Sequence, residues 1–307
     1  MSRTALGTLF VLLAGTCSGT MGIFGKLAYD EGATVGTLLV VRFAVAAALF
    51  WALLAVLRVP RPRMSRRDLG VAVGLGAVGY AAQAGAYFAA LSRIDASLVS
   101  LLVYTFPAMV AVAAIAIGKE RANPRHATAL VLALGGVGLV VAGAGTGTLD
   151  PLGVGLALAG AVIYSGYILV SDGIAGRLDP RVLAAIVTTG AAVTLVVATA
   201  ALGELRPGDL TALGWLWLVG LAVIPTFIAI GLFFAGLRLV GPTSAAILST
   251  LEPVATVVLA FLVFGDVLGP FQLLGGTLVL ASVPALHLRR RRRLPVLDDD
   301  RYARAHA

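Results

Sequence analysis

Charged residues are scarce in this 307-residue chain: Asp, Glu, Lys and Arg make up 12% of it, against about a quarter of a soluble domain. Hydrophobic residues account for 59%, and the mean hydropathy is +0.99. The chain has too few polar residues to cover a water-facing surface, so lipid must surround most of it. A bilayer crossing takes about 20 apolar residues, so ten crossings would leave no room for a separate soluble domain.

Cysteine and histidine are equally scarce. A single cysteine, Cys17, excludes an intramolecular disulfide and a cysteine cage for a metal. The three histidines lie far apart in the sequence, at His126, His287 and His306, so neither a metal nor a cofactor is expected. Zinc-protease, nucleophile-elbow and phosphate-loop motifs are also missing. The sequence therefore argues against an enzyme and against an ATP-driven pump.

Long apolar runs alternate with short segments of turn residues along the whole chain. Five of the breaks place a proline where the next helix would begin, a position at which its missing N–H costs nothing. We therefore expect an all-α integral membrane protein with ten transmembrane helices. Their approximate bounds are 5–28, 34–57, 68–91, 96–117, 126–144, 151–171, 181–202, 211–235, 243–264 and 270–287.

The basic residues are distributed unequally between the loops. With the N-terminus in the cytoplasm, 19 of the 23 Lys and Arg lie on the cytoplasmic side, and Arg93 and Arg206 lie outside. Lys26 and Arg42 fall within spans. This asymmetry follows the positive-inside rule, so both termini are predicted to be cytoplasmic in a multi-pass protein of the cell (inner or plasma) membrane. It also accounts for the net charge of +8 without a nucleic-acid partner.

The two halves of the chain match each other at a constant offset of 146 residues, which aligns Phe106-Pro107 with Glu252-Pro253. Five helices per half is an odd number, so the second half would enter the membrane in the opposite orientation. Such inverted five-helix repeats place a substrate site near the bilayer midplane in many secondary transporters. The expected units are a first repeat at 5–144, a second at 151–287 and a basic cytoplasmic tail at 288–307.

The chain resembles the EamA-like branch of the drug/metabolite transporter (DMT) superfamily from residue 5 to about 287. The resemblance rests on Leu251-Glu252-Pro253, on the turn Gly265-Asp266, and on Lys119-Glu120 at the matching turn of the first half. It implies a central cavity and secondary transport of small metabolites or drug-like solutes, often outward. A proton or a counter-exchanged metabolite would be the coupling partner. The first half has Phe106 in place of an acidic residue, so a mechanism with two carboxylates is not expected.

Glu252 is the acidic residue placed deepest in a predicted span. It lies about 14 Å along its helix, near the midplane, where a charge costs roughly 2.5–3.5 kcal/mol. Pro253 follows it and removes a backbone hydrogen bond, which loosens the turn. Glu252 could bind a solute or a proton while cycling between its neutral and charged forms. The alternative is a protonated side chain that only holds neighbouring helices together.

Arg42 and Lys26 are the two basic residues within spans. Arg42 needs an anion, which could be a carboxylate, a helix C-terminus or a group of the substrate; equally, it could fix its helix to the bundle. Lys26 lies near the outer end of the first span and can extend to the interface. Pairing with Asp30 or Glu31 would instead make it part of an outer gate.

Uncharged polar and aromatic residues suggest a lining for the cavity. Tyr80, Gln83 and Tyr87 share one helix face, while prolines mark helix breaks. This lining suits an amphipathic or zwitterionic solute, although tyrosines also occur at helix contacts and interfaces. The further lining candidates are Tyr104, Tyr164 and Thr226, and the predicted breaks are at Pro107, Pro253 and Pro225.

A channel or a lipid scramblase would use the same helices without alternating access, and it remains the alternative to a transporter. Channels need rings of charge or a continuous polar path, whereas one Glu and one Arg make a poor ring. Glycines spaced as G-x-x-x-G at Gly15/Gly19 and Gly70/Gly74 allow close helix packing or dimerisation. The expected assembly is a monomer or a homodimer.

Overall fold

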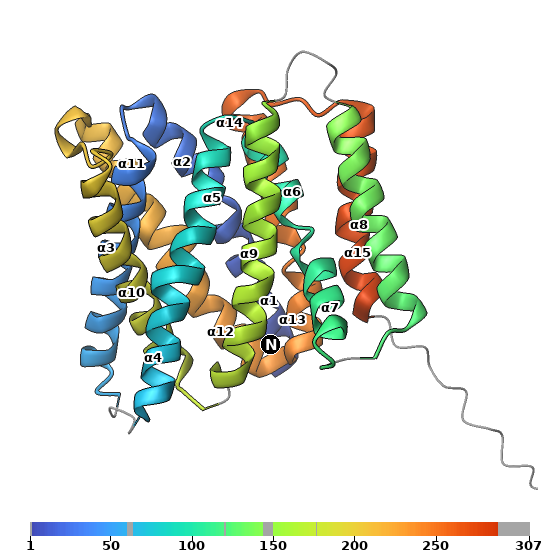
Figure 1. The fold of residues 1–307 in the computed structure, drawn as a ribbon, viewed down its shortest axis with the longest axis horizontal. Coiled ribbons are helices and arrows are strands. Elements are labelled where there is room, and N and C mark those ends of the chain that lie inside the picture. The colour runs from blue at the N-terminus through green and yellow to red at the C-terminus, as the bar shows by residue number, and fades with distance from the viewer. Residues whose placement is uncertain (1, 60–63, 120, 144–149, 176, 288–307) are drawn as a thin grey trace, which may run out of the picture.

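The protein is a bundle of helices standing side by side (Figure 1), seen in a computed structural model that describes residues 2–59, 64–119, 121–143, 150–175 and 177–287. No strand occurs in these described ranges. Eight of the described helices are long and apolar enough to cross a membrane, and two shorter apolar helices, Leu251–Phe264 and Pro270–Ala285, accompany them. Composition and helix length thus define a multi-pass α-helical membrane protein.

The first half forms five successive helical segments, three of which are interrupted. Their elements are α1 (Arg3–Gly19) with α2 (Met21–Asp30), α3 (Val35–Val56), α4 (Arg66–Gly74) with the π-helix η1 (Leu75–Tyr80) and α5 (Ala81–Leu91), α6 (Ala96–Val103) with α7 (Phe106–Ala116), and α8 (Pro124–Ala142).

The second half again forms five helical segments, two of which are interrupted. Its elements are α9 (Pro151–Ala175), α10 (Pro180–Ala201), a short 3₁₀ turn η2 (Pro207–Asp209), α11 (Ala212–Ala222) with the π-helix η3 (Val223–Ile228) and α12 (Ala229–Val240), α13 (Pro242–Leu248) with α14 (Leu251–Phe264), and α15 (Pro270–His287).

The helices of one half pack on those of the other in a regular pattern. α1 packs on α12 and α5 on α9, so the first segment of each half meets the third segment of the other half. α3 packs on α10, α6 on α14, and α8 on α15. The pair α8 and α15 stands at one side of the bundle (Figure 1). This pairing is unchanged when the two halves are exchanged, so the packing has an approximate twofold arrangement.

Helix interruptions recur at matching positions in the two halves. α6 gives way to α7 at Tyr104 and Thr105, and α13 gives way to α14 at Ser249 and Thr250, close to the offset of 146 residues. Pro107 and Pro253 lie in the first turn after each break, where the missing proline N–H cannot bond back to the preceding helix.

The third segment of each half contains a π-helix in place of a break. Pro225 lies within η3, where the helix is wider than an α-helix but continues. The sequence suggested a break at this proline. The matching π-helix η1 contains no proline, and nothing in its sequence, Leu75–Tyr80, predicts it. π-Helical turns occur frequently at functional sites, which directs attention to Tyr80 and Thr226.

Candidate functional site

Glu252 lies in the first turn of α14, directly after the break that follows α13. Its backbone packs against α1, since a Cβ added to Gly19 would lie 2.8 Å from the Glu252 carbonyl oxygen. As a whole residue Glu252 is half-buried, and its carboxyl group makes no hydrogen bond or ion pair with the residues that the structure describes. Backbone packing therefore fixes Glu252 in the bundle, while its carboxyl group has no partner among the described residues.

Arg42 is almost fully buried, at 2% exposure, in the middle of α3. Its Nε donates to Thr226 Oγ1 at 3.0 Å and its Nη2 to Tyr80 Oη at 3.4 Å. The guanidinium also lies over the rings of Phe43 and Phe88, at 5.0 and 5.3 Å from their centroids. No described carboxylate lies within ion-pair distance, so neutral hydroxyl groups and aromatic faces hold this cation.

The two hydroxyl partners of Arg42 are equivalent residues of the two halves. Tyr80 ends η1, Thr226 lies in η3, and 146 residues separate them. Thr226 also donates through its Oγ1 to the carbonyl oxygen of Leu221, five residues back in the last turn of α11. Arg42 thus joins both π-helices. The sequence indicated neither this link nor the roles of Phe43 and Phe88.

A chain of aromatic rings connects the break before α7 with Arg42. Tyr104 contacts Phe106 edge-on at 5.4 Å, and Phe106 contacts Tyr164 at 4.7 Å. Tyr164 stacks on Tyr167 at 5.9 Å, and Tyr167 lies 5.7 Å from Tyr80. Glu252 lies in the same region as these residues, because the carbonyl oxygen of Ser249, at the break just before it, accepts the hydrogen bond of Tyr104. Three of the predicted lining residues, Tyr80, Tyr104 and Tyr164, therefore belong to a chain of rings that leads from the buried cation to the helix breaks.

The two helix breaks contact each other. Tyr104, at the break of the first half, donates to the carbonyl oxygen of Ser249, at the break of the second. Ser165 Oγ of α9 donates to the carbonyl oxygen of Phe106 at 3.3 Å, while Gly19, the equivalent of Ser165, packs on the backbone of Glu252. Each break therefore packs against the first helical segment of the opposite half, which is α9 for the first break and α1 for the second.

Lys26 has a different partner from those predicted. Its Nζ lies 3.3 Å from Asp95 Oδ1 at the start of α6, so pairing with Asp30 or Glu31 is wrong. Glu31 accepts a hydrogen bond from Thr211 instead. Asp95 lies 69 residues away along the chain, and only the folded arrangement brings it to Lys26.

Two predicted lining residues have less direct roles. Tyr87 is buried and its hydroxyl lies beside Gly22 of α2. Gln83 is half-buried on the same helix, and its side chain forms no hydrogen bond with described residues. Within the described ranges, no three His, Cys, Asp or Glu side chains are grouped as a metal site would require.

A bundle in which broken helices meet, with a buried arginine and an unpaired glutamate nearby, is typical of membrane transporters. A model of the EamA-like transporter family matches residues 5–142 and again residues 151–286, and the chain belongs to this family.

Two relatives that the chain matches over nearly their whole length are named as transporters. The chain is 25% identical to the uncharacterized transporter YcbK of Bacillus subtilis over 295 residues, which cover 94% of this chain and 95% of YcbK. It is 28% identical to the uncharacterized transporter YwfM of the same organism over 285 residues, which cover 90% and 94%. A crystal structure with 20% identity superimposes with a TM-score of 0.67, covering 92% of this chain and 96% of the other, and shares its fold.

Proposed function

We propose that this membrane transporter is a secondary transporter that moves a small solute by alternating access, with export as its favoured direction. The two halves would rock as inverted five-helix repeats around the site at Glu252 and Arg42. A proton or a counter-exchanged solute would drive the cycle. The protein would have both termini in the cytoplasm of the cell whose membrane it occupies.

The observation that carries this proposal is the meeting of the two helix breaks beside one carboxyl group that has no partner among the described residues. Breaks leave backbone groups without helical partners, and inside a membrane this is tolerated where protein or a solute satisfies them. A carboxyl group without a protein partner is expensive at that depth unless it binds a proton or a cation during the cycle. Glu252 is therefore the residue proposed to bind the coupling ion or the solute.

The surroundings of Glu252 favour an amphipathic or zwitterionic solute. Tyr104, Phe106 and Tyr164 present apolar faces with hydroxyl groups at two of the rings, and Arg42 supplies a positive charge at the far end. An ammonium group could take Glu252 and the nearby ring faces. An anionic or polar end would then point toward Arg42.

The test compares Glu252→Gln with the parent protein by mass spectrometry of small molecules in cells and medium after matched overexpression. We expect a solute that leaves the cells with the parent protein and stays inside with Glu252→Gln, because Gln cannot ionise. Glu204→Gln is the matched control, since Glu204 is an exposed glutamate in the loop after α10. Normal export by Glu252→Gln would reduce Glu252 to a packing residue.

Counterflow in proteoliposomes separates alternating access from a channel or a scramblase. Vesicles preloaded with the exported solute should take up labelled solute against its gradient, and the rate should saturate. A linear, non-saturable flux without exchange would overturn the alternating-access proposal while leaving the fold and family unchanged.

A further inference from the structure

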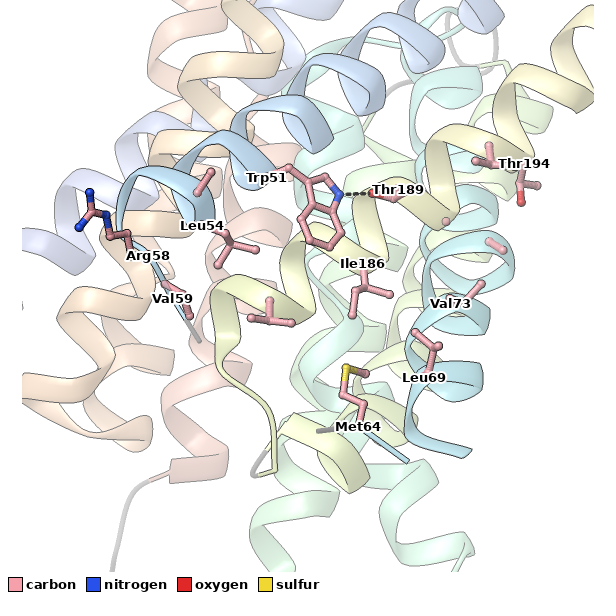
Figure 2. Close-up of a pocket in the computed structure, with 15 residues that line it drawn as sticks. Trp51, Leu54, Arg58, Val59, Met64, Leu69, Val73, Ile186, Thr189 and Thr194 are labelled. Atoms are coloured by element: carbon pink, nitrogen blue, oxygen red, sulfur yellow. Dashed lines mark hydrogen bonds between the residues drawn. The ribbon is translucent and has the colours of Figure 1, made fainter. Parts of the chain in front are cut away.

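An apolar groove runs along the outer face of α10, between α3 and α4 (Figure 2). The cavity has a volume of about 870 Å³, and its walls are mostly aliphatic. Trp51 of α3 bridges to α10 through a hydrogen bond of 2.9 Å from its Nε1 to Thr189 Oγ1. The groove is separate from the central site, because none of the residues around Glu252 and Arg42 lines it.

The length of the groove matches one leaflet of a bilayer. Its lining on α10 extends from Val182 to Thr194, which is roughly 18 Å at the helical rise of 1.5 Å per residue. Half of a hydrocarbon core about 30 Å thick has a similar depth, about 15 Å. An acyl chain lying along α10 would therefore be covered over most of its length.

Arg58 lies at the rim of this groove, with its guanidinium turned away from the apolar centre (Figure 2). It is the second residue after the end of α3 and has a φ of 49°, alone among the described non-glycine residues in having a positive φ. Glycine occupies the same position after α7 and α10, as Gly118 and Gly203. Glycine is the residue that suits this left-handed conformation. Because the backbone conformation at position 58 would favour glycine, the reason for an arginine there is a role of its side chain.

The charges at this end of the groove leave Arg58 available. Asp68 is paired with Arg177 at 3.1 Å and Asp179 with Arg181 at 2.7 Å. Arg58 forms no ion pair with any residue that the structure describes. This end of the groove is also the one predicted to face the cytoplasm, the leaflet in which anionic lipids are concentrated.

We propose that the groove between α3, α4 and α10 binds one anionic phospholipid, with an acyl chain along α10 and the headgroup phosphate on Arg58. Charge complementarity at the rim and the apolar lining below it select this occupant over a neutral lipid. The groove is separate from the solute site, so the lipid proposal can fail or hold whatever the outcome of the transport experiments.

Trp51 provides the measurement, because it lines the groove and is one of three tryptophans. The full chain with Trp215→Phe and Trp217→Phe is reconstituted into phosphatidylcholine vesicles that contain a minor fraction of lipid with brominated acyl chains. We expect brominated phosphatidylglycerol to quench Trp51 as if enriched about fivefold over brominated phosphatidylcholine, since one Arg near the surface contributes about 1 kcal/mol. Equal quenching by the two lipids would overturn the proposal.

Matched variants assign the effect to the groove. Arg58→Gly should abolish the preference while keeping the fold, because glycine suits the backbone there, and Arg58→Lys should retain it. Val193→Phe should lower quenching by both lipids by filling the groove. Trp215, left as the single tryptophan by Trp51→Phe and Trp217→Phe, is exposed outside the groove and should show no preference. Weak quenching by both lipids together with Trp51-dependent dimers would assign the groove to a second copy and overturn the proposal.

Discussion

The two halves of this protein have the same backbone plan and different chemistry. Both have a broken helix in the fourth segment and a π-helix in the third, at nearly the same offset. Yet Glu252 has Phe106 as its equivalent, and Arg42 has Thr188, whose hydroxyl bonds only to carbonyl oxygens of its own helix. The backbone arrangement is therefore present in both halves, whereas the central acidic and basic side chains are each present in one half only. This suits one central site formed by two similar halves.

The ends of the bundle show the same difference. Lys26 and Asp172 are equivalent positions with opposite charges. Lys26 pairs with Asp95, and Asp172 pairs with Lys119, each at 3.3 Å. The Lys26 side chain is 23% exposed and that of Lys119 is 44% exposed. Each end thus has an ion pair that uses one of these two equivalent positions, and the two pairs differ in burial. Three experiments test how far the halves differ.

The largest effect is expected from Arg42→Thr, which gives the first half the residue of the second. The change removes a buried side chain that touches both π-helices and leaves a cavity, so we expect a loss of about 2–5 kcal/mol in stability. Transport should also be lost. Thermal unfolding of the purified protein in detergent, followed by size-exclusion chromatography, measures the stability.

Thr188→Ala is the matched control for this experiment. It removes a hydroxyl group that bonds within its own helix, so we expect a loss of no more than about 1 kcal/mol. An unchanged melting temperature in Arg42→Thr would show that the guanidinium does not join the halves, and it would remove Arg42 from the central site.

The sequence predicted the segments well because lipid imposes a simple rule on them. A crossing needs a long apolar run, and prolines mark helix starts, so the expected bounds 34–57 and 181–202 differ by no more than one residue from α3 and α10. The broken fourth and ninth segments were also indicated by Pro107 and Pro253. The family and its transporter class followed from motifs in matching register.

The contacts could not be predicted in the same way, because they join positions far apart in the chain. Arg42 donates a hydrogen bond to Thr226, which lies 184 residues further along the chain. Lys26 forms its ion pair with Asp95 and not with Asp30 or Glu31, which are nearer in the sequence. The sequence of η1 contains no feature that predicts a π-helix, because a π-helical turn adds one residue without requiring a proline. Such features depend on how helices face each other, and hydropathy along one chain does not encode this.

A smaller effect is expected when the two end pairs are broken separately. Lys26→Gln should lower the melting temperature more than Lys119→Gln, because a less exposed pair is less screened by water and salt. We expect a loss of about 0.5–1 kcal/mol for Lys26→Gln and close to zero for Lys119→Gln. The same melting assay at low and high salt checks this order. Equal effects for the two variants would show that the ends are equivalent despite their burial.

The smallest effect concerns Asp266, in the turn after α14. Partial burial and the nearby negative charge of Asp95 raise the pKa of this carboxyl group, while Lys26 and Ser97 oppose the shift. A raised pKa means that the folded state favours the protonated form. The stabilising contribution is therefore complete at pH values below the ordinary aspartate pKa, and it is lost as the pH rises through the raised value.

Asp266→Asn should consequently stabilise the protein at neutral pH, because it removes the cost of ionising a partly buried carboxyl group beside Asp95. We expect a rise in melting temperature on the order of 1–2 °C, shrinking toward zero as the pH is lowered into the acid range. Melting curves of the parent and Asp266→Asn proteins across this pH range measure the difference. A difference that is constant with pH would mean that Asp266 acts through packing. In that case Lys26 and Asp95 would form the outer ion pair without it.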